Sequence, residues 1–161
     1  KNLDCEKTAV LGYRDADTFL ADEIGKYAGV VLATEDGSVG TKGNVIDAIR
    51  AKGLKADVIY ACGPTPMLKA LKAYAAENGI ECWISLEEKM ACGIGACLGC
   101  VCHTKDIDSH SNVRNTRICK DGPVFPAETV ELLTVEEQRE RIASGHQTEA
   151  CACSRVKIKE D

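Results

Sequence analysis

The stretch DVIYACGPTPMLKALKAYAAENGIECWIS, residues 57–85, decides the fold class. It begins with a short apolar run over 57–61, passes through a helical pattern, and ends with a second apolar run over 80–84. Short, continuous and largely β-branched runs are typical of strands buried on both faces of a parallel sheet. The stretch therefore predicts a strand, a helix and a second strand that together form one crossover unit.

The helix of this unit has recognisable start and stop signals. Thr65 is the expected N-cap, a proline follows it at the first helical position, and Gly79 is the expected stop. A stripe at helical spacing, made of Met67, Leu71 and Tyr74, is the face expected to be buried.

Two further helices are expected upstream. One spans about 45–52, with Asn44 as a plausible N-cap and Gly53 just past its end. The other spans about 16–27. Its apolar face would consist of Leu20, Ile24 and Tyr27.

Two earlier apolar runs, over 8–11 and 29–33, complete an alternation of strands and helices through residues 1–85. Such alternation predicts an α/β fold with a doubly wound parallel sheet and right-handed crossovers, here a partial NAD-binding domain. No G-x-G-x-x-G follows the first run. Either the sheet binds no dinucleotide, or its phosphate loop lies upstream of Lys1.

Composition excludes several classes of protein. Of 161 residues, 45% are hydrophobic and 28% charged, which is typical of a globular chain. With 20 Lys and Arg against 25 Asp and Glu, the net charge of −5 argues against nucleic-acid binding. No apolar run approaches the length of a membrane span, and no leader precedes the first strand, so we expect a cytoplasmic location and no membrane partner. A start at Lys1, without Met, indicates a fragment or a processed product.

Cysteine is the outlier, with ten residues in the chain. Cys92-Gly-Ile-Gly-Ala-Cys97-Leu-Gly-Cys100 is followed, after eighteen residues, by Cys119. C-x4-C-x2-C with one distant cysteine is the spacing of plant-type [2Fe–2S] ligation. Structural zinc more often takes two separate C-x2-C units, and it stays open here as the less favoured alternative.

Residues 86–126 contain this motif and are poor in apolar side chains. So small a module can hardly fold by burial alone, and we expect the metal site to hold it together. Its loop glycines are expected where the backbone curls and directs amides at sulfur; they are Gly93, Gly95 and Gly99. Cys102 is predicted to be a buried bystander rather than a substitute ligand.

A second signal, Cys62-Gly63-Pro64, stands at the carboxyl end of a strand and the start of a helix. Ligands of open α/β sheets bind at such ends, and a glycine there lets a flat ring approach the backbone. Equally, Cys62 is a small buried strand residue in a tight turn between strand and helix, and the spacing does not separate the two interpretations. Arg14 and Asp15 follow the first strand and would meet phosphate and ribose, although solvated turns are commoner there.

The remaining segment, 127–161, is polar and forms a partly helical extension. Thr134 with Glu137 predicts a capping box. Two cysteines are interpreted as tail thiols: Cys151 and Cys153. Three histidines lack ligand spacing and are expected at the surface: His103, His110 and His146.

Three segments together closely resemble the electron-transfer subunit family of bacterial NAD-dependent dihydroorotate dehydrogenase. They are residues 62–68, 85–102 and 118–125, within a resemblance that covers roughly residues 8–130. That family belongs to the ferredoxin-reductase-like flavoproteins. Its full-length members carry an FAD-binding β-barrel, an NAD-binding α/β domain and a C-terminal [2Fe–2S] domain. They partner an FMN-containing catalytic subunit that oxidises dihydroorotate in pyrimidine synthesis.

Carried over by position, the resemblance implies four cluster ligands, Cys92, Cys97, Cys100 and Cys119. It also places Cys62 and Gly63 beside nicotinamide and flavin. The implied electron path runs from dihydroorotate through FMN, the cluster and FAD to NAD+. Without the FAD barrel and the glycine-rich loop, the chain alone is expected to be inactive. Two alternatives stay open: a reductase subunit that passes NAD(P)H electrons to ferredoxin or sulfur compounds, and a non-enzymatic module held together by zinc.

Overall fold

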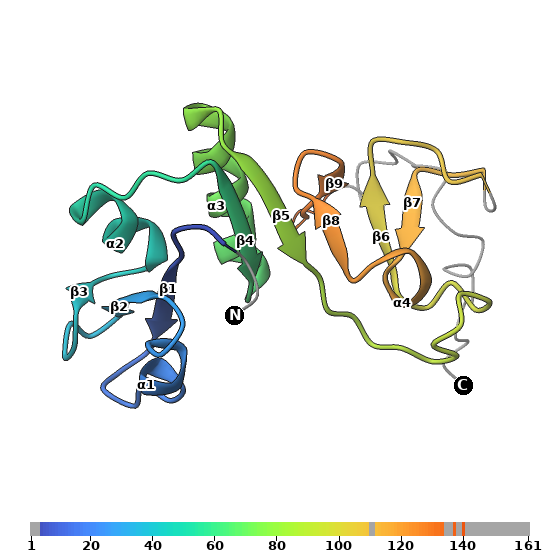
Figure 1. Ribbon diagram of the computed structural model, residues 1–161. Coiled ribbons are helices and arrows are strands. Elements are labelled where there is room, and N and C mark those ends of the chain that lie inside the picture. The colour runs from blue at the N-terminus through green and yellow to red at the C-terminus, as the bar shows by residue number, and fades with distance from the viewer. Residues whose placement is uncertain (1–3, 110–111, 134–136, 138–139, 141–161) are drawn as a thin grey trace. The chain divides into compact units, whose positions relative to one another are not determined.

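The structure is a computed structural model that describes residues 4–109, 112–133, 137 and 140 (Figure 1). The chain divides into two compact units, Lys1–Ala56 and Asp57–Asp161. Among the described residues, no helix has the length and apolar character needed to span a membrane. Several sequence predictions lie outside the described residues: the capping box at Thr134, His110, His146, Cys151 and Cys153.

The first unit contains a three-stranded parallel sheet in the order β1-β2-β3. Its strands are β1 (Thr8–Tyr13), β2 (Gly29–Thr34) and β3 (Thr41–Lys42). The two apolar runs predicted as strands are confirmed, and each strand continues slightly beyond its run. Residues 14–28, between β1 and β2, are long enough for the crossover that a parallel pair of strands requires.

Helix α2 (Val45–Ala51) begins and ends close to the predicted residues. The Asn44 side chain accepts hydrogen bonds from the backbone N–H of Ile46 and Asp47, and the Asp47 carboxylate accepts one from the Asn44 N–H. This capping box satisfies amides that have no partner within the helix. The apolar side chains of α2 supply much of the buried surface of the first unit: Val45, Ile46, Ala48 and Ile49.

The long helix predicted over 16–27 is wrong. Only α1 (Ala21–Ile24) is helical, and the residue before it, Leu20, has a left-handed φ of 65°. The Asp15 carboxylate accepts a hydrogen bond from the Asp17 N–H, which holds the preceding backbone in a turn. The expected apolar face is also solvent-exposed, with Leu20 54% and Tyr27 52% exposed, so packing does not stabilise a longer helix.

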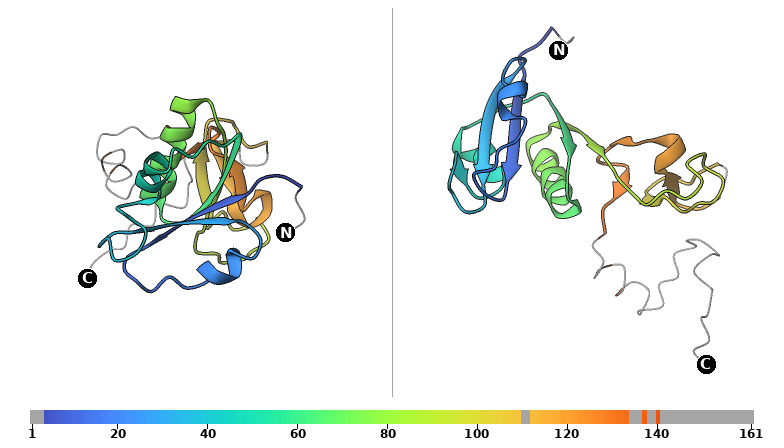
Figure 2. Two further views of the ribbon diagram at one scale, coloured as in Figure 1. Left: turned by 60° about the vertical axis from the view of Figure 1, so that its left-hand side comes forward. Right: turned by 90° about the horizontal axis from the view of Figure 1, so that it is seen from below.

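The second unit contains the predicted strand-helix-strand crossover. Strands β4 (Val58–Cys62) and β5 (Glu81–Ser85) are parallel, and β8 (Val124–Pro126) joins the free edge of β5 in the antiparallel direction. Helix α3 (Thr65–Asn78) packs against one face of β4 and β5 (Figures 1 and 2). The parallel strands of the chain therefore lie in two three-stranded sheets, and a single doubly wound sheet stays a prediction.

Helix α3 differs from its prediction at the start and agrees at the end. Pro64 occupies the N-cap position, so Thr65 is already helical, and no side chain caps the helix. Gly79 ends it with a left-handed φ of 65°, as predicted. The buried stripe of α3 shares only Leu71 with the predicted one. Its other two residues each follow a predicted residue by one position, so the stripe consists of Leu68, Leu71 and Ala75.

A small antiparallel sheet forms the cysteine-rich region. Strand β6 (Val101–Thr104) lies between β7 (Asn115–Arg117) and β9 (Val130–Glu131), and the short helix α4 (Ile118–Asp121) follows β7. This is a mixed α/β chain, with parallel sheet followed by a small antiparallel cysteine-rich region.

The cysteine-rich region packs against elements that precede it, which the composition of its own segment does not reveal, and its stabilisation by a metal site stays a prediction. Its buried residues share one core with α3 and β5. That core includes Leu68, Ile84, Ile118, Phe125 and Val130, each less than 10% exposed. Sequence composition counts apolar residues within a segment, whereas this core collects them from elements on both sides of residue 86.

Candidate metal centre

The loop between β5 and β6 carries the first three cysteines of the motif. Three of its residues adopt left-handed backbone conformations: Gly93 with φ 69°, Gly95 with φ 82° and Leu98 with φ 55°. Glycine adopts this conformation without the steric cost that a side chain brings. Gly93 and Gly95 therefore sit at tight bends, as the sequence predicted. At Gly99 the reason for glycine is steric, because a Cβ there would lie only 3.3 Å from Cys97 Sγ.

The first two cysteines of the motif contact each other. The Cys97 backbone N–H donates a hydrogen bond to Cys92 Sγ at 3.4 Å, and the two thiols also interact through their side chains. The Gly99 N–H donates to Cys97 Sγ, again at 3.4 Å. Both thiols are solvent-exposed. The loop therefore presents one pair of thiols, with backbone amides directed at both sulfurs.

The other two cysteines form a second pair. Cys100 lies at the end of the loop and is buried, whereas Cys119 lies in α4 and is half-buried. The Cys119 N–H donates to Cys100 Sγ at 3.4 Å, and the Ile118 N–H donates to the Cys100 carbonyl at 3.0 Å. These contacts bring the distant fourth cysteine of the motif to the loop.

The four thiols of the motif form two hydrogen-bonded pairs, Cys92 with Cys97 and Cys100 with Cys119. Across the described residues, no group of three or more His, Cys, Asp or Glu side chains is arranged to hold one metal ion. Four thiolates are a donor set that both iron–sulfur clusters and structural zinc sites use.

The environments of the thiols also differ electrostatically. Hydrogen bonds from the backbone N–H of Ile94 and Cys97 lower the pKa of Cys92 to about 6, which favours the thiolate that metals bind. The pKa of Cys119 is raised, first by its hydrogen bond with the Cys100 side chain and then by burial, while the Gly95 N–H works in the opposite direction.

Cys102 follows Cys100 by two residues and interacts with it electrostatically. It belongs to β6, is half-buried and packs against the shared core. Burial raises its pKa to about 11, so its neutral thiol is strongly favoured. These surroundings agree with the predicted role of a bystander.

A buried charged group beside Cys119 was not among the predicted site residues. Arg117 is 5% exposed, and its Nε donates to Asp121 Oδ2 at 3.0 Å. Its Nη2 lies 3.8 Å from Asp108 Oδ1, and its Nη1 donates to the Gly95 carbonyl at 3.4 Å. The i, i+4 spacing of Arg117 and Asp121 was the only local sequence signal for this network.

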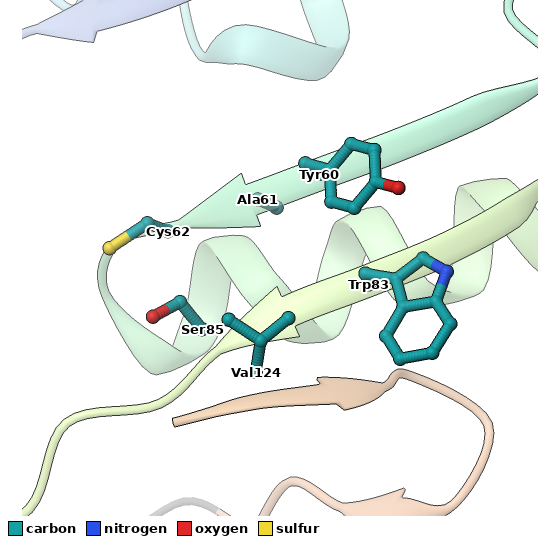
Figure 3. A pocket seen from close by; sticks show the side chains of 6 residues that line it. All are labelled: Tyr60, Ala61, Cys62, Trp83, Ser85 and Val124. Atoms are coloured by element: carbon teal, nitrogen blue, oxygen red, sulfur yellow. The ribbon is translucent and has the colours of Figure 1, made fainter. Parts of the chain in front are cut away.

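A second candidate site lies on the β4-β5-β8 sheet, on the face opposite α3. Figure 3 shows the rings of Tyr60 and Trp83 on this face and Cys62 at the end of β4. The hollow measures about 170 Å³, and its lining residues are Tyr60, Ala61, Cys62, Trp83, Ser85 and Val124. Cys62 is exposed rather than buried, which contradicts the alternative interpretation as a buried turn residue.

Gly63 gives this turn its shape. Its φ is 156°, and a Cβ at this position would lie 2.5 Å from the Met67 methyl carbon. The absence of a side chain therefore lets Met67 pack beneath the turn. Pro64 then begins α3 at the N-cap position. The structure thus brings Cys62, Gly63 and Pro64 together at the carboxyl end of β4.

Arg14 and Asp15, the other predicted nucleotide residues, belong to the first compact unit and directly follow β1. Both are exposed. The Asp15 carboxylate accepts from the Asp17 N–H, and the Arg14 carbonyl accepts from the Asp36 N–H. The first contact stabilises a turn and the second joins the segments that follow β1 and β2, and the roles of Arg14 and Asp15 in nucleotide binding stay predictions.

Residues 87–131, which hold all four cysteines of the motif, match the iron-sulfur cluster binding domain of dihydroorotate dehydrogenase B. The Bacillus velezensis "Dihydroorotate dehydrogenase B (NAD(+)), electron transfer subunit" is 48% identical over 124 residues, which cover 76% of this chain and 46% of that protein. Over about three quarters of its length, the chain is similar to dihydroorotate dehydrogenase B electron transfer subunits. The resemblance seen in the sequence is confirmed.

A further electron transfer subunit and one solved structure are also similar to this chain. The Caldanaerobacter subterraneus electron transfer subunit is 47% identical over 120 residues, covering 74% of this chain and 47% of that protein. A chain from a structure of NADH-dependent reduced ferredoxin-NADP oxidoreductase superposes with a TM-score of 0.67 at 30% identity, covering 93% of this chain and 52% of that one. The chain spans about half the length of the curated relatives it matches.

Proposed function

We propose that this chain is the electron-transfer part of an NAD-dependent dihydroorotate dehydrogenase, and that it holds a [2Fe–2S] cluster. The proposed ligands are Cys92, Cys97, Cys100 and Cys119. The observation that carries the proposal is the arrangement of these thiols as two contacting pairs within the segment that matches the iron-sulfur family. When bound, the cluster would supply one-electron transfer between centres that accept one or two electrons.

The chain's own groups would tune such a cluster through hydrogen bonds. The amides of Cys97, Gly99 and Cys119 already donate to sulfur at 3.4 Å. N–H groups directed at thiolate sulfur stabilise negative charge, which is one of the means by which a protein sets a cluster's potential. The buried sulfur of Cys100 and the adjacent Ile118 limit the access of water from the side of the core.

For the nucleotide, we propose that the Cys62-Gly63-Pro64 turn and the hollow beside Tyr60 lie near nicotinamide and flavin. The supporting observations are an exposed cysteine at a strand end and an uncovered aromatic sheet face. Arg14 and Asp15 are proposed as contacts to the same nucleotide. The parallel strands are proposed to belong to a doubly wound, ferredoxin-reductase-like NAD domain.

The complete protein would pass electrons from dihydroorotate, oxidised on an FMN-containing partner subunit, to NAD+, with FAD as an intermediate carrier. These assignments rest on the relatives, which are about twice as long as this chain. A cytoplasmic location is also proposed, because the described cysteines are free thiols and thiols persist in reducing compartments.

A second candidate is a reductase subunit that acts on ferredoxin. The superposition on an NADH-dependent reduced ferredoxin-NADP oxidoreductase supports it, but that chain is 30% identical, against 48% for the dihydroorotate dehydrogenase relative. The zinc-stabilised module is disfavoured, because the segment that carries the four cysteines matches an iron-sulfur cluster binding domain.

The proposal is tested by anaerobic reconstitution of the chain with iron and sulfide, followed by metal and acid-labile sulfide analysis. We expect about two irons and two sulfides per chain and, after reduction, the EPR signal of a single unpaired electron spin. A parallel incubation with zinc serves as the control. A chain that binds one zinc tightly and retains neither iron nor sulfide would contradict the proposed function.

A further inference from the structure

The side chain of Arg117 is buried directly beside the fourth cysteine. It stands at the N-cap of α4, two residues before Cys119. Two of its groups, the backbone N–H and Nε, donate to Asp121 Oδ2 at 3.1 and 3.0 Å, and its Nη2 lies 3.8 Å from Asp108 Oδ1. These two carboxylates compensate the buried guanidinium, which would otherwise be costly to remove from water.

The same guanidinium also reaches the loop of the first cysteines. Its Nη1 donates to the carbonyl oxygen of Gly95 at 3.4 Å, across 22 positions of sequence. Gly95 lies midway between Cys92 and Cys97. One side chain therefore connects the element that carries Cys119 with the loop that carries the first pair of thiols.

Helix α4 also contacts Gly95 through the side chain of Lys120. A Cβ at Gly95 would lie 2.8 Å from Lys120 Cδ and 3.1 Å from Lys120 Cβ, so the α4 side chain packs directly on its backbone. The carbonyl oxygen and the Cα of Gly95 thus both lie against residues of the segment 117–120.

We propose that Arg117 is a positioning residue, which holds the Cys92–Cys97 loop in register with Cys119 through the Gly95 carbonyl. The inference rests on the proposed iron–sulfur function and extends it to a residue that touches no sulfur. A guanidinium suits this task because its planar fork directs several donors at diverging acceptors, here Asp121, Asp108 and Gly95. A lysine ammonium at the same position keeps the charge but cannot maintain the same set of contacts.

The test compares Arg117→Lys with Arg114→Lys in the full chain. Arg114 is exposed and lies three residues earlier, so it controls for the same change of residue type. Each protein is reconstituted anaerobically, and the rate of iron release to a chelator and the EPR spectrum of the reduced protein are measured. We expect Arg117→Lys to release iron at least about tenfold faster, as for the loss of one charge-assisted hydrogen bond, with altered g values. Arg114→Lys should match the wild type in both measurements.

Should Arg117→Lys fail to fold, the double variant Arg117→Met, Asp121→Asn replaces it, because it removes both charges and the donor to Gly95 together. The same faster release and altered spectrum are expected. A variant at position 117 with the wild-type release rate and spectrum would overturn this inference while the cluster assignment stands. A wild-type chain that acquires no iron or sulfide would overturn both.

Discussion

At the level of single residues, the surroundings of each cysteine decide its chemistry. Cys92 and Cys97 are exposed on a loop whose amides face their sulfurs, Cys82 is buried in the sheet, and Cys102 is half-buried against the core. Amide hydrogen bonds favour a thiolate, whereas burial favours a neutral thiol. The same residue type is therefore a proposed ligand at some positions of the second unit and a core residue at others.

The ligand assignment predicts different outcomes for two neighbouring cysteines. Cys97→Ser should abolish the cluster, because it removes one of four thiolates, while the α/β part stays folded. The matched variant Cys102→Ser should keep the cluster, since Cys102 belongs to neither pair of thiols. Iron content, visible absorbance and circular dichroism check both expectations. Full cluster absorbance in Cys97→Ser would show the assignment to be wrong.

Cys82 predicts a pH dependence of stability. Burial raises its pKa above the ordinary thiol value of 9.0, with Lys72 acting in the opposite direction. Below pH 9 the folded and unfolded chains both keep this proton, so the full stability is present. Above it, the unfolded chain loses the proton first, and stability falls until the pH passes the folded pKa.

Removing the Cys82 thiol should remove this loss of stability at high pH. In urea unfolding between pH 8 and about pH 11, we expect the stability of the wild type to fall relative to that of Cys82→Ala, and the difference to be constant near pH 8. The comparison cancels other groups that titrate in the same range. Parallel curves over the whole range would contradict the assigned burial effect.

At the level of elements, α3 packs both against the strands of its own crossover and against the cysteine-rich region. Leu68 is 2% exposed and packs in the same core as Ile118, Phe125 and Val130 of the cysteine-rich region. Further along α3, Lys72 Nζ donates to the Val130 carbonyl. The cysteine-rich region is therefore supported by a helix that lies before it in sequence.

A cavity in this core should affect the metal centre. Leu68→Ala is expected to lower the free energy of unfolding by about 2–5 kcal/mol. It should also speed iron loss, because α3 and the cysteine-rich region share this core. Glu77→Ala, exposed on the same helix, should change the free energy of unfolding by less than about 0.5 kcal/mol. Urea unfolding followed by Trp83 fluorescence and by cluster absorbance should give coincident transitions. Separate transitions would contradict one shared core.

At the level of the whole molecule, the chain consists of two compact units, each with its own sheet and buried residues. The proposed ligands and the hollow at Cys62 all belong to the second unit. Arg14 and Asp15 belong to the first. The candidate metal centre and part of the predicted nucleotide site therefore belong to different units of the chain.

This division predicts a localised effect of damage to the first unit. Ile49→Ala removes a residue of α2 that is 9% exposed, and should destabilise that unit by about 2–5 kcal/mol. We expect faster hydrogen exchange in β1 and β2, with iron retention and exchange in β4 and β5 unchanged. The exposed Lys52→Ala should leave both unchanged. Iron loss in Ile49→Ala would show that the cluster depends on the first unit.

The sequence by itself determined the features that depend on neighbouring residues. Strands β1, β2, β4 and β5, the Asn44 cap, the Gly79 stop and the cysteine spacing are all local patterns, and each could be predicted. The failures were also local in origin: the turn at Asp15 and the left-handed Leu20 interrupted a helix that spacing alone favoured.

Tertiary structure decided which distant groups meet. The pairing of Cys100 with Cys119, the contact of Arg117 with Gly95 and the core shared by Leu68 with Phe125 join residues that are 19 or more positions apart. Periodicity and spacing describe only the conformation within a segment. Contacts between segments depend on how several elements pack at once, so they emerge only when the chain is folded.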